Sequence, residues 1–223
     1  MDLENSKPAE TLAARLLMVT AVLSLVAVLH HPVLPPVHGA AETAQAIRSL
    51  AGMDRLVHGA LIVLFALQMV GFYYFSAGLG FRRPMVVAGF VAYAAGALTM
   101  IIPATLDGFV TPDLVEECAI AARCGDGQGA LITLIAVAIQ DFTKIALAAI
   151  SVSTLCWGAV LIGGPGRIQR AAGLVGLACA MAPLAALAVS RIHLVPGNLA
   201  VIVAAQLVWN LVAATAMLSR NRG

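Results

Sequence analysis

Long apolar runs separated by short polar segments are the main pattern of this chain. A helix needs about 20 apolar residues to cross the ~30 Å hydrocarbon core of a bilayer. The runs of that length predict spans at about residues 12–31, 54–76, 84–102, 145–162, 171–189 and 198–218. The pattern therefore predicts an all-α integral membrane protein with a bundle of six transmembrane helices.

The polar segments predict how these spans are connected. Residues 11–219 are expected to form a single transmembrane domain, with a flexible N-terminal tail over 1–10 and a basic C-terminal tail over 220–223. Short surface helices are expected over Ala40–Ala51 and Pro112–Arg123, in the two longer connections.

Two features set the limits of the third and fourth spans. Pro103 is expected to end the third span, because proline cannot donate a helical hydrogen bond. The apolar run Gly129–Ile162 would extend ~51 Å as one helix, which exceeds the hydrocarbon core. Asp141 and Lys144 in its polar segment are therefore expected at the boundary of the span, with residues 130–139 protruding, lying in the interface or packing under the long connection.

Composition agrees with a membrane protein and excludes other classes. Apolar residues make up 61% of the chain and charged residues only 11%, whereas soluble domains carry about 25% charged residues. The net charge of +2 and the lack of a basic run argue against a nucleic-acid partner. The expected partner is the lipid bilayer. Cys118 and Cys124 lie in one outer connection, where a disulfide between them stays open.

Basic residues predict the orientation of the bundle. An even number of spans puts both termini on one side, and eight of the 13 lysines and arginines fall on that side. They are Lys7, Arg15, Arg82, Arg83, Arg167, Arg170, Arg220 and Arg222. The positive-inside rule makes this side cytoplasmic. We therefore expect a multi-pass protein of the plasma (inner) membrane, with its histidines on the outer side.

Histidines and carboxylates at the outer helix ends are the candidate site. Asp54 and His58 are four residues apart and share one helix face. The candidate metal ligands are His30, His31, His58, His193 and Asp107, and the candidate catalytic residues are Asp54, His58, Asp141 and Lys144. Imidazole with carboxylate suits a transition metal, and imidazole alone can ligate haem. The same groups also suit proton transfer.

The positions of these polar residues also have a simpler explanation that needs no functional site. Polar residues gather at the ends of spans because water and headgroups solvate them there, and no histidine spacing in the chain is diagnostic of a metal. Deeper in the spans, Gln68, Gln206 and Asn210 are candidate substrate-binding residues. Buried amides also join helices to each other, so both roles stay open.

The sequence favours a membrane protein whose outward-facing His/Asp site binds a metal, haem or a small lipophilic molecule. Whether it is an enzyme or a redox-handling component is not decided by these patterns. A small-molecule or ion transporter is one alternative, because Gln68, Gln206 and Asn210 are polar groups inside spans. An accessory subunit of a larger membrane complex or oligomer is the other, and it would need no site.

Overall fold

The computed structural model describes residues 6–33, 39–121, 127–189 and 196–220, and these residues are helical apart from short turns and contain no strand. Six helices are long and apolar enough to cross a membrane. The elements are α1 (Ser6–Leu29), α2 (Ala40–Leu79), α3 (Pro84–Thr105), the π-helical turn η2 (Leu106–Val110), α4 (Thr111–Ala121), α5 (Gly127–Ile162), α6 (Arg167–Val189) and α7 (Pro196–Arg220). The prediction of an all-helical chain with six such helices is confirmed.

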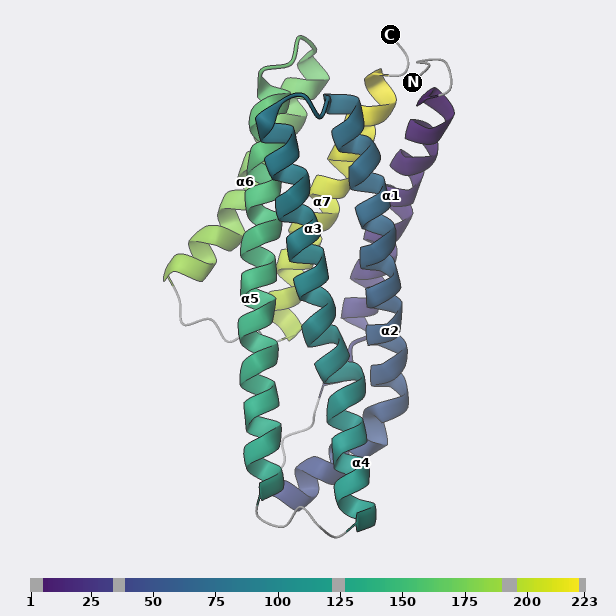
Figure 1. Ribbon diagram of the computed structural model, residues 1–223, viewed down its shortest axis with the longest axis vertical. Helices are drawn as coiled ribbons and strands as arrows, with labels where there is room; N and C mark the ends of the chain where they lie inside the picture. The colour runs from purple at the N-terminus through teal and green to yellow at the C-terminus, as the bar shows by residue number, and fades with distance from the viewer. Residues whose placement is uncertain (1–5, 34–38, 122–126, 190–195, 221–223) are drawn as a thin grey trace.

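The six long helices form a closed ring. Following the chain, α1 packs on α2, α2 on α3, α3 on α5, α5 on α6 and α6 on α7, and α7 returns to α1. The start of α1 and the end of α7 lie at one end of the molecule, together with the α2–α3 and α5–α6 turns (Figure 1). Each helix therefore turns one face toward a shared interior.

Aromatic rings fill this interior toward the end that holds the termini. Phe72 stacks on Trp157 with ring centroids 4.7 Å apart, and Tyr93 lies 4.4 Å from Phe72. Phe75 and Trp209 complete the cluster, and all five side chains are buried. This end of the ring is thus closed by packed rings, which leaves the opposite end for cavities.

Close backbone contact joins α5 to α6. A Cβ atom added to Gly173 would lie 2.6 Å from the carbonyl oxygen of Gly158, which is too close for a real side chain. Small residues commonly permit this approach between apolar helices, where van der Waals packing is the main attraction. The Gly158–Gly173 contact therefore fixes the position of α5 relative to α6, although both helices are mostly apolar.

Helices α2 and α5 and the continuous α3–η2–α4 segment extend beyond the other helices at the end opposite the termini (Figure 1). α2 has 40 residues, or about 60 Å, roughly twice the thickness of a hydrocarbon core. The short helix predicted over Ala40–Ala51 is in fact the first part of α2. α5 is continuous from Gly127 to Ile162, so residues 130–139 extend the helix of the predicted fourth span.

Pro103 does not end α3, contrary to the sequence-based prediction. It lies inside the helix, where its missing N–H removes one helical hydrogen bond. The chain continues into the π-helical turn η2, and the Thr111 hydroxyl donates to the Leu106 carbonyl at 2.8 Å. The chain thus accommodates the hydrogen bond that Pro103 removes by a local π-helical turn, and the helix does not end there.

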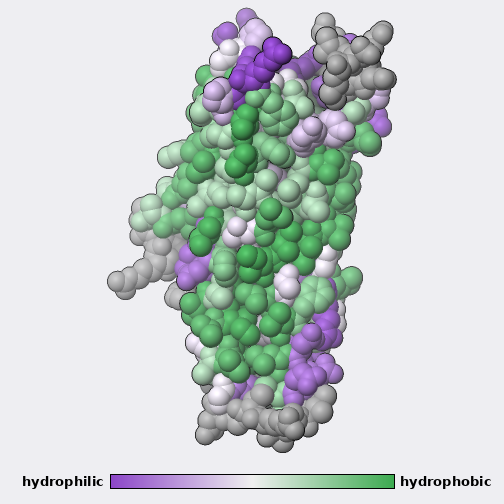
Figure 2. Space-filling model, viewed as in Figure 1, coloured by the Kyte–Doolittle hydropathy of each residue, from purple (hydrophilic) through white to green (hydrophobic). Residues whose placement is uncertain are grey.

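Apolar side chains cover most of the visible surface. Charged groups gather at the end with the termini and along one edge of the opposite end (Figure 2). Exposed apolar residues occur on different helices of the ring, including Val63, Val91, Ile145 and Leu174. Such a surface is consistent with contact to a lipid bilayer.

Candidate metal centre

Three polar atoms from three separate elements converge inside the ring, just beyond the end of α1. His31 Nε2 lies 3.3 Å from His58 Nε2. Asp107 Oδ2 lies 3.6 Å from His31 Nε2 and 3.4 Å from His58 Nε2. The three atoms therefore form a nearly equilateral triangle between the end of α1, the middle of α2 and the turn η2.

Backbone carbonyls fix the orientation of both imidazoles. His31 Nδ1 lies 2.8 Å from the Pro32 carbonyl oxygen, and His58 Nδ1 lies 2.9 Å from the Asp54 carbonyl oxygen. A carbonyl oxygen only accepts, so each Nδ1 carries the hydrogen and donates it. In the neutral rings, both Nε2 atoms then present lone pairs to Asp107. Three acceptors this close need a shared positive charge, supplied by a proton or by a metal ion.

The triangle has the size of a metal-ligand face. Tetrahedral Zn²⁺ with bonds of 2.0–2.2 Å to nitrogen and oxygen separates neighbouring ligand atoms by about 3.3–3.6 Å. The observed separations of 3.3, 3.4 and 3.6 Å fall in this range. Two neutral imidazoles with the carboxylates of Asp54 and Asp107 would carry two negative charges, which a divalent cation balances.

Asp54 lies behind His58. Its Oδ1 is 3.1 Å from His58 Nδ1 and 4.0 Å from His31 Nε2. The Nδ1 hydrogen is directed at the Asp54 carbonyl, so the buried Oδ1 has no hydrogen-bond partner among the described residues. One ligand atom each from His31, Asp54 and His58 lie within 4.8 Å of one another. A buried carboxylate oxygen without a donor is costly, and a nearby cation would remove that cost.

Gly108 permits this arrangement. A Cβ atom at residue 108 would lie 2.4 Å from His58 Cβ and 3.0 Å from His58 Nδ1. The η2 backbone therefore rests directly on the His58 side chain, and this contact brings the preceding Asp107 within reach of both imidazoles. In the sequence, Gly108 is marked only by its position next to the candidate carboxylate of Asp107, and this signal is too weak to predict its role.

The site is shielded on one side and open on the other. The side chain of His58 is 6% exposed, whereas that of Asp107 is 35% exposed. His31 and Asp54 fall between them, at 20% and 16%. Water therefore reaches the centre from the Asp107 side.

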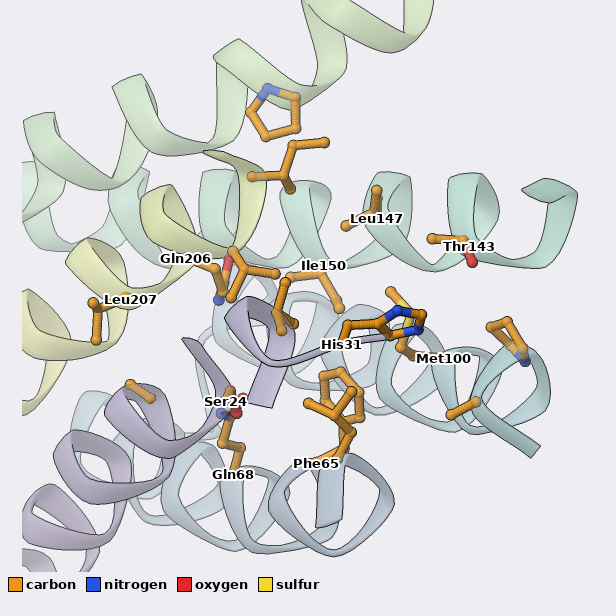
Figure 3. A pocket seen from close by; sticks show the side chains of 18 of the residues that line it. Ser24, His31, Phe65, Gln68, Met100, Thr143, Leu147, Ile150, Gln206 and Leu207 are labelled. Atoms are coloured by element: carbon orange, nitrogen blue, oxygen red, sulfur yellow. Dashed lines mark hydrogen bonds between the residues drawn. The ribbon is translucent and has the colours of Figure 1, made fainter. Parts of the chain in front are cut away.

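Two cavities meet at the centre. The inner cavity has a volume of about 150 Å³ and extends from His31, His58 and Asp107 toward the aromatic cluster. The outer cavity, of about 410 Å³, extends the other way, beside the projecting parts of α2 and α5. Both are lined by Val28, His31, Asp107, Ile139 and Thr143. Figure 3 shows the imidazole of His31 to one side of Ser24, Gln68 and Gln206 in the inner cavity.

The amides predicted as substrate-binding residues line the deep end of the inner cavity. Gln68 donates to Ser24 Oγ at 3.2 Å and accepts from the Tyr93 hydroxyl at 3.0 Å. Gln206 donates to Asn210 at 3.1 Å. Gln68, Gln206, Asn210 and Ser24 all line this cavity. They therefore join neighbouring side chains and also form a polar floor.

Other predicted site residues lie elsewhere. The side chain of His30 is exposed, and its Nδ1 lies 2.9 Å from the Val26 carbonyl oxygen. Lys144 pairs with Asp141 at 3.3 Å, with side chains 37% and 63% exposed, and the residues that line the two cavities include neither. Their neighbours Gln140 and Thr143 line the outer cavity instead.

Two predictions depend on segments that the structure does not describe. His193 lies outside the described residues, so its place relative to the centre stays a prediction. Cys118, in α4, is disulfide-bonded, but Cys124 lies outside the described residues, so its identity as the partner stays a prediction.

The chain matches no protein-family model, no curated protein and no solved structure at a significant level. A shared fold would in any case identify only an architecture, because unrelated activities occur on one fold. Function is therefore inferred from the geometry of His31, Asp54, His58 and Asp107.

Proposed function

We propose that this protein is a membrane metalloenzyme with one divalent transition-metal ion, acting on a small lipophilic molecule. His31, His58 and Asp107 would hold the ion, and Asp54 would orient His58 through its backbone carbonyl and add a negative charge beside the ion. The triangle formed by His31 Nε2, His58 Nε2 and Asp107 Oδ2, with edges of 3.3–3.6 Å, is the observation that carries this proposal. A backbone carbonyl that accepts a hydrogen bond from the other ring nitrogen is a common way to fix a metal-bound histidine.

Zinc fits this donor set, as does iron(II), which binds two histidines and one carboxylate in non-haem enzymes. Two histidines and one carboxylate are typical of catalytic zinc sites, which keep a further coordination position open. Bound zinc would polarise a substrate oxygen or activate water. Haem fits less well, because Asp107 Oδ2 lies close to both imidazole nitrogens, where a macrocycle would need space. Copper is the main competitor, since it binds most nitrogen sites more tightly than zinc.

The membrane placement in this proposal rests on charge and depth. Arg82 and Arg83 in the α2–α3 turn, with Arg167 and Arg170 after the α5–α6 turn, lie at the end with the termini, and the positive-inside rule supports a cytoplasmic side for that end in a plasma membrane. His58 lies about 31 Å along α2 from its last residue, Leu79, and Asp107 lies about 35 Å along its helix from Pro84. Both distances put the centre at the outer boundary of a ~30 Å hydrocarbon core.

The cavities support a ligand site in preference to the other functions that the sequence leaves open. A transporter needs a path through the interior of the helix ring from one membrane side to the other. The packed aromatic side chains of Phe72, Trp157 and Tyr93 fill that interior on the side of the termini. An accessory subunit needs no such centre, and gives no reason for a buried carboxylate oxygen of Asp54 without a donor. A three-ligand metal between two cavities accounts for both observations.

Metal analysis of the purified full-length chain tests the proposal. Protein produced with zinc in the medium should carry one zinc ion per chain after dialysis. His31→Ala and His58→Ala should each lose it, because two protein ligands hold zinc poorly. His30→Ala is the matched control and should keep the metal, because its side chain is exposed and adjacent in sequence to His31. Zinc, copper and iron contents no higher than those of His58→Ala would overturn the proposal.

A further inference from the structure

The inner cavity begins at the candidate metal centre and runs into the apolar interior of the ring. His31, His58 and Asp107 lie at its outer end. Beyond them the wall is formed by Phe65, Met100, Leu147, Ile150, Val203 and Leu207, which come from α2, α3, α5 and α7. An open position on a metal at this place would face both cavities. A ligand bound to the metal would thus have an apolar compartment directly beneath it.

The dimensions of this compartment limit what it holds. His58 and Gln68, at the two ends of the inner cavity, are separated by about 15 Å along α2. An engineered apolar cavity of similar volume, about 150 Å³, binds a single benzene-sized molecule. The inner cavity is therefore long and narrow for its volume, and this shape fits one unbranched alkyl chain.

We infer that the ligand of this centre is a single-chain amphiphile, with its metal-binding polar head at His31, His58 and Asp107 and its alkyl chain in the inner cavity. This inference rests on the proposed metal centre and adds the class of ligand. The hydrogen-bonded floor at Gln68 and Gln206 ends the compartment, so the chain is of short or medium length. The outer cavity leaves the head within reach of water, because Asp107 is the most exposed of the three.

Alkyl hydroxamates test this inference, because their head binds metal ions and their chain length can be varied. Zinc-loaded protein in detergent is titrated with acetohydroxamate, octanohydroxamate and hexadecanohydroxamate. Octanohydroxamate should bind at least about tenfold more tightly than acetohydroxamate, since its chain enters an apolar wall. Hexadecanohydroxamate should gain nothing further, because the floor at Gln68 stops the chain.

Variants distinguish binding of the alkyl chain in the inner cavity from partitioning of the chain into detergent, which could also cause a preference for octanohydroxamate. Val203→Phe places a larger side chain in the inner cavity and should abolish the tenfold preference while zinc content is unchanged. Val201→Phe is the matched control on the same helix, because Val201 is 71% exposed, and it should keep the preference. Leu147→Trp is a second blocking variant if Val203→Phe does not fold.

The outcomes are distinguishable. If the wild-type chain binds no metal, the proposed function fails and this inference fails with it. If zinc is bound but the preference for octanohydroxamate is absent, only the inference on ligand class is overturned. The same holds if the preference is equally large in Val203→Phe, since detergent partitioning would then explain it.

Discussion

His31 Nε2 lies 3.3 Å from His58 Nε2 although the two residues are 27 positions apart in the chain. Their rings meet nearly at right angles, with centroids 4.9 Å apart. Each ring directs its other nitrogen at a backbone carbonyl, so the two facing nitrogens are acceptors when the rings are neutral. With Asp107 adjacent to both, the three atoms need a shared positive charge, and the proposed metal ion would supply it in place of a proton.

The two carboxylates of the centre should differ in their effect on metal affinity. Asp107→Asn should abolish tight zinc binding, because it removes the charged ligand. Asp54→Asn should still bind zinc at saturating concentration, but the zinc affinity should fall about 10–100-fold, because the change removes a negative charge next to the centre and leaves the backbone carbonyl that orients His58. Competition with a chelator measures both constants. Asp113→Asn is the control, because Asp113 is 64% exposed and pairs with Arg55. Equal losses for Asp54→Asn and Asp107→Asn would contradict these separate roles.

Gly108 should be required for the centre. Gly108→Ala would place a methyl group 2.4 Å from His58 Cβ. We expect the η2 turn to move away from α2, with loss of zinc and a loss of about 1–3 kcal/mol in the free energy of unfolding. Thermal unfolding and metal analysis measure these effects.

A neighbouring glycine gives the control for that experiment. At Gly59, the nearest atom to an added Cβ is Phe109 Cζ at an ordinary 3.6 Å. Gly59→Ala should therefore keep zinc, and it should stabilise α2 by up to about 1 kcal/mol, because alanine is the better helix former. If both alanine variants behave alike, close packing on His58 is not what positions Asp107.

The polar floor should contribute to stability and not to metal binding. Tyr93→Phe removes the hydroxyl that donates to Gln68 at 3.0 Å inside the ring. We expect a loss of about 0.5–1.5 kcal/mol in the free energy of unfolding, with full zinc content. Tyr73→Phe makes the same chemical change at a side chain that is 46% exposed and should be neutral. Loss of zinc in Tyr93→Phe would show that the floor and the metal centre are coupled.

Orientation in the membrane can be tested by labelling single cysteines with an impermeant maleimide on intact cells, after the native cysteines are changed to serine. Val33→Cys should be labelled, because Val33 is exposed and follows the metal ligand His31 on the proposed outer side. Arg83→Cys, in the exposed α2–α3 turn, should react only after the cells are opened. The opposite pattern would place the metal centre on the cytoplasmic side.

The helical, apolar character of the chain and the number of helices long enough to span a membrane were predictable without the structure, because each depends on local composition. It also singled out Asp54 and His58, since residues four apart on a helix share a face. Helix limits were harder to predict. Pro103 is a local signal for a break, yet α3 continues past Pro103, and α5 is continuous through the polar residues 140–144.

Which of the candidate metal-binding side chains lie close together depends on the tertiary structure. His30 and His31 are adjacent, but one ring is exposed and the other lies between His58 and Asp107, because neighbouring side chains leave a helix end in different directions. The place of Asp107 depends on a π-helical turn held close to α2 by Gly108. Such contacts depend on how the six helices close into a ring, and the spacing of residues along one chain contains no direct record of that closure.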